Sequence, residues 1–155
     1  MSASERSAPA TTVSPLEVLR NHRVIAVVGA SKNPEKDAHS VPLYLKEHGY
    51  KIIPINPTAE ELFGERAYPT LRDVPRELAQ QIEVVDVFRP SEELPKVAHQ
   101  VVEMKRLYRS PLTFWAQLGL ESEEAKRILI ENDIPYVMNE CTRAEHQRAR
   151  REGYF

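Results

Sequence analysis

The sequence contains one cysteine, no long apolar run and no excess of basic residues. Because Cys141 has no second cysteine to pair with, no internal disulfide can form. No apolar stretch approaches the roughly 20 residues needed to span a bilayer, so we exclude a transmembrane segment. The 21 basic and 23 acidic side chains give a net charge of -2. This balance argues against nucleic acid as the main partner, because such proteins usually carry a basic excess.

The start of the chain, Met1 to Thr12, lacks the apolar core of a signal peptide, so we expect a cytoplasmic protein. Residues 1–13 are rich in Ser, Ala and Thr without periodicity, which predicts a flexible N-terminal arm. Residues 14–155 have the length of one domain. The 41% apolar and 28% charged residues of the whole chain are typical of a globular domain.

Five short apolar runs bounded by turn residues have the pattern of buried parallel strands. They are Val24 to Val28, Lys51 to Ile55, Val84 to Phe88, Leu112 to Ala116 and Tyr136 to Met138. Helical patterns lie between these runs, and strands that alternate with helices require crossover connections. The sequence therefore predicts an α/β fold, a Rossmann-like three-layer α/β/α domain with a five-stranded parallel sheet.

Serine residues predict the starts of four helices. These serines are Ser14, Ser40, Ser91 and Ser122. Ser14 is followed by Pro15, which suits a first helical position, and we expect this short helix to cover one edge of the sheet. The helix after Ser40 is expected to stop at Gly49. The stretch 56–83 is the least regular, with a predicted turn at 61–64 and one helical turn at 70–74.

In an open parallel sheet, ligands bind beyond the carboxyl ends of the strands, where the strand order reverses. The residues that follow the five predicted strands are therefore the candidates for a site. They are Gly29 to Lys32, Asn56 and Pro57, Arg89 and Pro90, Gln117 to Gly119, and Asn139 to Cys141.

Gly29 permits a tight turn before a helix N-terminus, which suits a phosphate, although many such turns carry glycine for backbone geometry alone. The nearby Ser31, Lys32 and Lys36 add donors suited to a phosphate. The G-x-G-x-x-G spacing of dinucleotide-binding domains is absent, and the second strand ends in Asn56 instead of an acidic residue. This counts against NAD, and the missing P-loop pattern counts against ATP held through a Walker motif.

Seven segments, in order along the chain, carry a family resemblance. They are Val28 to Ser31, Leu45 to Tyr50, Ile53 to Pro57, Leu62 to Gly64, Val85 to Arg89, Trp115 to Gly119, and Cys141 with Glu145. In these segments the chain resembles the small, single-domain CoA-binding proteins, which are similar to the CoA-binding domain of the succinyl-CoA synthetase alpha subunit. The resemblance runs from about Val24 to Glu145.

The resemblance implies that a Rossmann-like sheet holds coenzyme A. Its nucleotide end would lie against the turn after the first strand, and the residues after the third and fourth strands would line the rest of a groove. Lys32, Lys36 and Arg89 suit the pyrophosphate and the 3'-phosphate, and we expect an apolar adenine slot with a few polar groups. The predicted CoA-binding residues are Gly29, Ala30, Ser31, Lys32, Lys36, His39, Asn56, Pro57, Phe88, Arg89, Pro90, Gln117 and Gly119.

Two residues are candidates for chemistry beyond binding. His39 is expected in the turn between the first strand and its helix, where it could contact a ligand or act as a base. Cys141 could be a nucleophile or a buried, inert thiol. Where members of this family often have Asp-Arg before the cysteine, this chain has Asn139 and Glu140, so a role that depends on those charges is not expected.

The other histidines, Trp115 and the basic C-terminal segment are expected to have structural roles. The other histidines show no metal-like spacing with one another or with Cys141, so no metal site is predicted. Trp115 is expected in the core. The basic tail from Arg143 to Arg151 is interpreted as a solvated terminal helix, because acidic residues interrupt it.

The sequence thus favours a non-catalytic binding or regulatory module for CoA or an acyl-CoA. Its expected partner is this small molecule, with neither nucleic acid nor membrane, and a protein partner stays possible. One alternative is an enzyme that acts on a CoA thioester through His39 or Cys141, although no triad or carboxylate pair is recognisable. A second alternative is an NAD-binding regulatory protein.

Overall fold

The structure is a computed structural model that describes residues 13–110 and 112–155. The predicted flexible arm lies outside the described residues except for Val13. Among the described residues, no helix has both the length and the apolar character required to cross a membrane.

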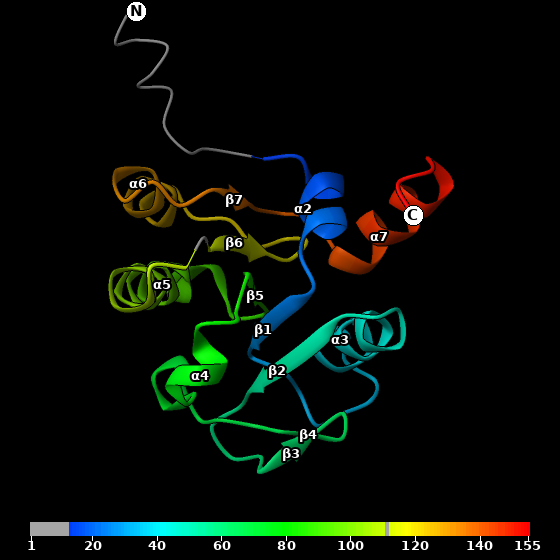
Figure 1. The fold of residues 1–155 in the computed structure, drawn as a ribbon, viewed down its shortest axis with the longest axis horizontal. Coiled ribbons are helices and arrows are strands. Elements are labelled where there is room, and N and C mark those ends of the chain that lie inside the picture. Colours follow the sequence, from blue (N-terminus) through cyan, green and yellow to red (C-terminus); the bar gives the residue numbers. More distant parts are fainter. Residues whose placement is uncertain (1–12, 111) are drawn as a thin grey trace, which may run out of the picture.

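A five-stranded, all-parallel sheet forms the centre of the domain, with the strand order β2-β1-β5-β6-β7 (Figure 1). The strands are β1 (Val24–Val28), β2 (Lys51–Ile55), β5 (Val84–Val87), β6 (Thr113–Ala116) and β7 (Tyr136–Val137). Because helices cover both faces, nearly every strand residue is buried. This explains why the strands appear in the sequence as continuous apolar runs, and it confirms the predicted Rossmann-like fold.

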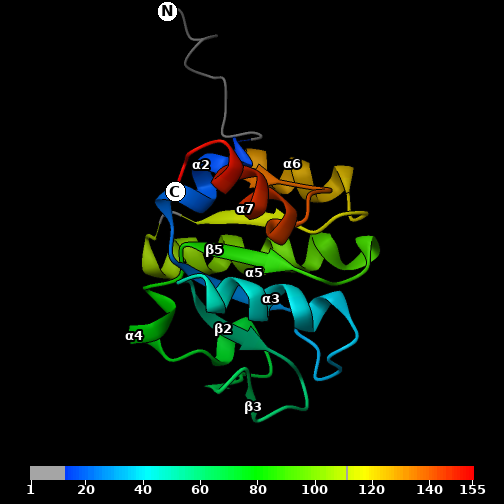
Figure 2. The same cartoon turned by 90° about the vertical axis from the view of Figure 1, so that its right-hand side faces the viewer.

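Helices cover both faces of the sheet (Figures 1 and 2). One face carries α4 (Arg76–Ala79), α5 (Leu94–Tyr108) and α6 (Glu123–Glu131), and the other carries α2 (Pro15–Asn21), α3 (Asp37–Glu47) and α7 (Thr142–Arg151). Alternate residues of each strand point to opposite faces: Val85 and Val87 pack under α5, whereas Ile25 and Val27 pack with Leu45 of α3. The two faces form separate apolar cores.

The start of α2 matches its predicted cap, but its position corrects a prediction. Ser14 accepts a hydrogen bond from the N–H of Glu17 at 3.4 Å. Leu19 is buried with strand residues from the middle of one face, so α2 covers a face of the sheet and not an edge. Val13, two residues before α2, lies at the edge of the sheet, because its N–H donates to the carbonyl of Tyr136 in β7 at 3.2 Å.

The helix α3 begins four residues before the position predicted from Ser40. Its first residue is Asp37 and its N-cap is Lys36, so Ser40 is the fourth helical residue and not the cap. In its first turn Asp37 is exposed, the next three residues are partly buried, and none of the four is a large apolar residue, which is why hydrophobic periodicity could not detect it. Gly49 follows the last turn with φ +97°, as its predicted role as a stop requires.

A proline inside α3 connects this helix to the loop after β1. Pro42 has no N–H, so the carbonyl of Ala38, four residues earlier, receives no helical hydrogen bond from it. That carbonyl accepts instead from the N–H of Ser31 at 3.1 Å. Because Pro42 lacks an N–H, the carbonyl of Ala38 is free to bind the loop 30–36 to the start of α3.

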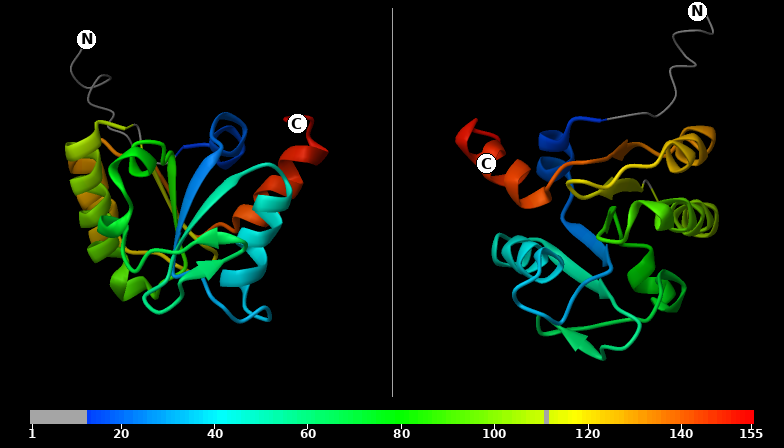
Figure 3. Two further views of the ribbon diagram at one scale, coloured as in Figure 1. Left: turned by 60° about the horizontal axis from the view of Figure 1, so that its bottom comes forward. Right: turned by 180° about the vertical axis from the view of Figure 1, so that it is seen from behind.

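The irregular stretch after β2 folds into short elements at the edge of the sheet (Figure 3). A hairpin of β3 (Glu61–Leu62) and β4 (Glu65–Arg66) confirms the predicted turn. Lys46 of α3 donates to the carbonyl of Phe63 in this turn and pairs with Glu65 at 3.2 Å. A 3-10 helix, η1 (Leu71–Asp73), follows at the predicted helical turn.

On the α5 side of the sheet, one of the two predicted helix starts is confirmed and the other is shifted. Ser122 caps α6 by accepting from the N–H of Ala125 at 3.0 Å, as predicted. Ser91 opens a second 3-10 helix, η2 (Ser91–Glu93), and α5 begins only at Leu94.

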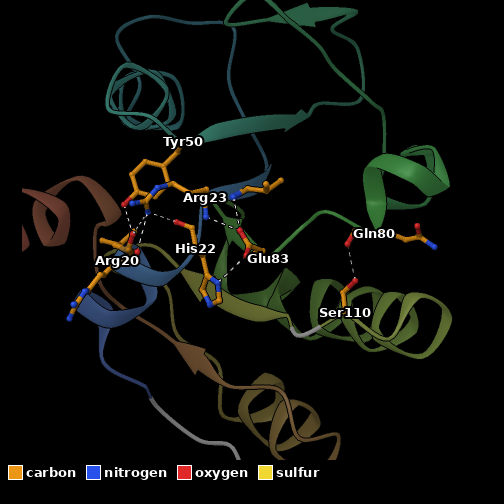
Figure 4. A network of polar contacts seen from close by, with 9 residues as sticks. Arg20, His22, Arg23, Tyr50, Gln80, Glu83 and Ser110 are labelled. Carbon is orange, nitrogen blue, oxygen red and sulfur yellow. Dashed lines mark hydrogen bonds and ion pairs between the residues drawn. The ribbon is translucent and has the colours of Figure 1, made fainter. Parts of the chain in front are cut away.

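At the amino ends of the strands, polar groups bond to one another (Figure 4). One Glu83 carboxylate oxygen accepts from the N–H groups of Arg23 and Val24 at 2.8 and 3.1 Å, and the other lies 3.5 Å from Nδ1 of His22. Burial raises the pKa of Tyr50 to about 12, and its hydroxyl donates to the carbonyl of Leu19 at 2.5 Å. These contacts join the segments that precede β1, β2 and β5 to one another and to α2.

Candidate functional site

The crevice between β1 and β5 is the point where the strand order reverses. From β1 the chain crosses through α3 to β2 on one side, and it then returns to place β5 on the other side. The segments after β1 and β5 therefore leave the sheet toward opposite faces, which opens a crevice at the carboxyl ends of these strands. Gly29 follows β1, and Phe88 and Arg89 follow β5.

Gly29 is required by the packing of this crevice. Its φ is +90°, and its N–H donates to the carbonyl of Ile55 at 3.2 Å. A Cβ atom at this position would lie 2.9 Å from Cδ of Arg89 and 3.1 Å from the carbonyl oxygen of Phe88. The positive φ and the close approach of Arg89 together account for the glycine, because the absent side chain lets the aliphatic part of Arg89 pass across the turn.

A groove of about 230 Å³ opens beside this turn on the α5 side of the sheet. Its lining combines apolar side chains with a polar and charged rim, which is the composition expected of a small-molecule site. Three of the predicted binding residues line it, namely Gly29, Pro57 and Arg89. The other lining residues are Val28, Ile55, Pro69, Thr70, Leu71, Glu93, Lys96, Val97 and Gln100.

Sequence reasoning missed most of the groove's rim. Thr70 and Leu71 belong to the irregular stretch after the hairpin, and Glu93, Lys96 and Gln100 precede or lie on α5. The last three recur at intervals of three and four residues, so the helical period places them on one side of α5. Their spacing was a usable signal, but nothing in the sequence indicated that this side of the helix faces the crevice.

A larger hollow of about 590 Å³ lies at the β3–β4 hairpin, lined by residues 59–61, 66–67 and 69. It meets the groove at Pro69 but contains none of the predicted binding residues. The smaller groove is the better candidate because it lies at the strand-order reversal, where the fold places ligands.

Arg89 and Glu93 form an ion pair on the rim of the groove. Nε and Nη2 of Arg89 lie 3.1 and 2.9 Å from the two carboxylate oxygens of Glu93. The hydrogen bond from Arg89 holds the pKa of Glu93 below its usual value, with the nearby charges of Arg89 and Lys96 contributing. Both side chains are between 40 and 50% exposed, so water screens the pair.

The loop from Ala30 to Lys36 uses several of its polar groups internally. The hydroxyl of Ser31 accepts from the N–H of Asn33 at 3.0 Å, and the N–H of Ser31 is bound to Ala38 as described above. Lys32 and Lys36 are exposed on this loop. The loop thus presents two mobile cations to solvent from a backbone that is fixed by local hydrogen bonds.

His39 lies in the third position of α3 and not in the turn before it, which corrects its predicted placement. Its Nδ1 is 2.7 Å from the carbonyl oxygen of Ser31, so Nδ1 carries the proton and Nε2 is the remaining acceptor in the neutral ring. The ring also meets Phe63 edge-on, with 4.9 Å between centroids. This side chain holds the loop 30–36 against α3 and the hairpin.

Asn56 connects the segment after β2 to the turn after β1. Its Nδ2 donates to the carbonyl of Ala30 at 2.7 Å, and its Oδ1 accepts from the N–H groups of Thr58 and Ala59 at 2.8 Å each. The side-chain amide is therefore used within the protein, and the neighbouring Pro57 lines the groove.

Gln117 is buried and does not line the groove. Its Nε2 donates to Oδ1 of Asp86 at 2.7 Å and to the hydroxyl of Thr142 at 2.9 Å. Asp86 is fully buried in β5, and burial raises its pKa to about 7, against the opposing effect of these hydrogen bonds. Gln117 is thus part of a polar cluster that joins β5, β6 and the start of α7.

The neighbouring predicted residues also have structural partners. The N–H of Gly119 donates to Oδ1 of Asn139 at 2.6 Å, which joins the loops after β6 and β7. Asn139 has φ +64°, a conformation that Asn tolerates better than most residues. Phe88 packs against the α3-side core, and Pro90 is exposed before η2.

Cys141 is the N-cap residue of α7 and is partly exposed. Beside it, burial and then repulsion from Glu145 raise the pKa of Glu140, while Glu145 pairs with Arg148 at 2.9 Å. The described residues contain no group of three histidine, cysteine or acidic side chains that could hold a metal ion.

Trp115 was expected in the core, and the terminal helix was expected to be solvated. Trp115 is fully buried and donates from Nε1 to the carbonyl of Glu140 at 2.8 Å, which confirms its place in the core. The helix α7 exists, but the interpretation that it is solvated is wrong for one face. Thr142, His146 and Ala149 are buried, and polar or small residues gave no hydrophobic periodicity to predict this.

Residues 23–147 match the family described as "CoA binding domain". The chain is 39% identical over 130 residues to the uncharacterized protein YneT of Bacillus subtilis, with 84% of this chain and 90% of that protein covered. It is 32% identical over 120 residues to the ADP-forming acetate–CoA ligase II of Archaeoglobus fulgidus, of which it spans only 18% while 76% of this chain is covered.

A solved structure titled "The structure of cell-free ID.343 from Thermus thermophilus" has a TM-score of 0.75 and 36% identity to this chain. The aligned region covers 88% of this chain and 99% of the Thermus thermophilus chain. With the match over residues 23–147, these similarities show that the chain belongs to the CoA-binding domain family.

Proposed function

We propose that this chain, as a member of the CoA-binding domain family, binds coenzyme A or an acyl-CoA at the crevice between β1 and β5, as a module without catalysis of its own. The observation that carries the proposal is the groove beside Gly29, which has an apolar lining and two cations, Arg89 and Lys96, on its rim. Family membership supports CoA as the ligand, and the fold supports the position.

The groove fits the nucleotide end of CoA. Its apolar lining, which includes Ile55, Pro57 and Leu71, suits the faces of an adenine ring, and its polar rim can meet the ring edges and the ribose. The phosphates of CoA need cations or N–H donors, and Arg89, Lys96, Lys32 and Lys36 lie on the rim or on the loop after β1. When bound, CoA supplies a thiol that carries acyl groups.

The geometry suggests different roles for the predicted binding residues. We expect direct contacts from Gly29, Pro57 and Arg89, and charge from Lys32 and Lys36. Asn56 and His39 use their main polar groups within the protein, so we expect them to support the loop after β1. Gln117 and Gly119 are also bonded within the protein, and we expect them to have structural roles away from the ligand. Ala30, Ser31, Phe88 and Pro90 are expected to shape the crevice through the backbone.

An enzyme acting on a CoA thioester is less well supported. In the part of the chain that the structure describes, the only hydrogen-bond partner of the His39 ring is a backbone carbonyl, and Cys141 has no side-chain partner. A general base or an activated thiol needs a side-chain partner that orients or activates it. NAD is disfavoured because Asn56, which stands where an acidic residue would bind the ribose, is occupied by backbone groups.

Isothermal titration calorimetry with CoA, acetyl-CoA, NAD and ATP tests the proposal. We expect saturable binding of CoA or acetyl-CoA, with NAD and ATP at least tenfold weaker. Arg89→Gln should weaken CoA binding about tenfold, because a charge-assisted contact to a phosphate is lost. Arg127→Gln, an exposed change on α6, is the matched control. Absence of binding to both CoA species would exclude the proposed function.

A further inference from the structure

We propose that Glu93 is a built-in competitor for the phosphate of the ligand: it holds Arg89 in the free protein, and a bound phosphate group takes its place. This inference rests on the proposed function, because it concerns the same groove. It assigns to Glu93 the role of setting the affinity for a phosphorylated ligand.

The first support is the position of Arg89. Its aliphatic part passes across Gly29, where Cδ would lie 2.9 Å from a Cβ atom, and its guanidinium reaches the rim of the groove. This packing limits the places that the guanidinium can occupy. A phosphate that enters beside the turn after β1 meets the cation already in position.

The second support is the geometry of the pair. Glu93 engages Nε and Nη2 of Arg89 at 3.1 and 2.9 Å, with the two carboxylate oxygens on two parallel donors. A phosphate uses the same two-donor geometry when it binds arginine. The carboxylate and a phosphate therefore compete for the same donors of Arg89.

The third support is the weakness of the pair. An ion pair between exposed side chains contributes little to stability, because water screens the two charges, and both partners here are more than 40% exposed. A phosphate ester with up to two negative charges can displace such a carboxylate. After displacement, Glu93 still lines the groove and repels the phosphate, so its charge lowers the affinity.

The alternative is that Glu93 only stabilises the start of α5. It is the N-cap residue, but its side chain makes no capping hydrogen bond, and its contribution would be limited to the helix dipole and the Arg89 pair. This alternative predicts a small loss of stability in a Glu93 variant and no gain in ligand affinity. The two readings thus predict different results for CoA binding.

Glu93→Gln is the decisive variant, because glutamine has the same shape and can still accept one hydrogen bond from Arg89. Removing one like charge within a few ångströms of a phosphate at an exposed site should tighten CoA binding by about three- to tenfold at low salt. The gain should shrink in 0.5 M salt, where the Debye length is only about 4 Å. Glu92→Gln, an exposed change in η2, should leave the affinity within about twofold.

The experiment is calorimetric titration of the full chain and its variants with CoA and with dephospho-CoA. An Arg89→Gln background should remove most of the gain from Glu93→Gln, because the competition acts on Arg89. If Glu93→Gln tightens the binding of CoA but not of dephospho-CoA, Arg89 contacts the 3'-phosphate. If it tightens the binding of both ligands, Arg89 contacts the pyrophosphate. Thermal unfolding of each variant checks that the fold is retained.

The outcomes separate this inference from the proposed function. If the wild-type chain binds CoA and Glu93→Gln binds it equally or more weakly, the inference is wrong and the proposed function stands. If the gain from Glu93→Gln persists in full without Arg89, the competition for Arg89 is also wrong. If the wild-type chain binds no CoA species, the proposed function fails first.

Discussion

Two regions at the carboxyl ends of the strands look alike in the sequence and differ in the structure. The crevice region, at β1 and β5, presents exposed cations and an open groove. The corner region, at β6 and β7 with the start of α7, buries Gln117 and Thr142 around Asp86 and satisfies them with one another. Polar residues that follow strands therefore differ in whether the protein itself uses their hydrogen-bonding groups.

The largest effect is expected from Gln117→Leu, which tests whether the corner region is structural. This change removes the amide that donates to Asp86 and leaves a buried carboxyl group with one fewer partner. Loss of a partner from a buried ionisable group costs about 3 kcal/mol, so denaturant titration at pH 8 should show a reduction of that order. Gln147→Leu, an exposed change on α7, is the control and should change the stability little.

CoA affinity of the folded Gln117→Leu protein should stay within about threefold of the wild type. A loss of affinity much larger than this, without loss of stability, would show that the corner region contacts the ligand and would break the comparison.

Gly29→Ala is expected to have the next largest effect, in the crevice region. Alanine at φ +90° is strained, and its Cβ would meet Arg89 and the backbone of Phe88. We expect a loss of about 2 kcal/mol in unfolding free energy, together with at least tenfold weaker CoA binding. Gly49→Ala has a similar φ of +97° but open space around the Cβ position, so it should lose about 1 kcal/mol and keep its CoA affinity.

The comparison of these two glycine variants isolates the close approach of Arg89. Equal stability losses in both variants, with CoA affinity retained in both, would mean that Gly29 is required for φ alone.

The pH dependence of stability sharpens the description of the corner region. Burial raises the pKa of Asp86 to about 7 in the folded chain, whereas an aspartate in an unfolded chain titrates near 3.9. The folded state therefore holds the proton more tightly, so this contribution to stability is present below pH 4 and is lost as the pH rises toward 7. Asp86→Asn should remove this pH-dependent loss of stability.

Denaturant titrations of Asp86→Asn and the wild type between pH 4 and 8 measure this difference. His146 contributes with the opposite sign, because burial, and then the charges of His48, Arg150 and Arg23, lower its pKa. The difference between the two proteins cancels this common background. A pH-independent difference would contradict a titrating Asp86.

The strands were predictable because each is buried on both faces and forms a continuous apolar run. The start of α3 was not, because its first turn carries no large apolar residue and its link to Ser31 depends on the missing N–H of Pro42. Gly29 was correctly placed at a strand-end turn, but the reason it must be glycine lies in Arg89, 60 positions away. Sequence patterns report local geometry and burial more directly than long-range contacts.

The site was predictable only in part for the same reason. Pro57 and Arg89 were selected because they lie just after predicted strands, and both line the groove. Gln117 also follows a strand, but its partners Asp86 and Thr142 come from two other elements, so its burial was not visible. Arg143 was assigned to a solvated tail, yet its Nη1 reaches the hydroxyl of Ser40 on α3 at 3.4 Å.

The most direct test of the central claim is an NMR titration of the ¹⁵N-labelled chain with CoA. We predict that the largest amide shift changes occur in residues 28–32, 55–58, 69–71 and 88–100, around the crevice and its groove. Residues 117–119 and 139–142, in the corner region, should change much less. Saturable shifts centred on the corner region, with the crevice unchanged, would contradict the account.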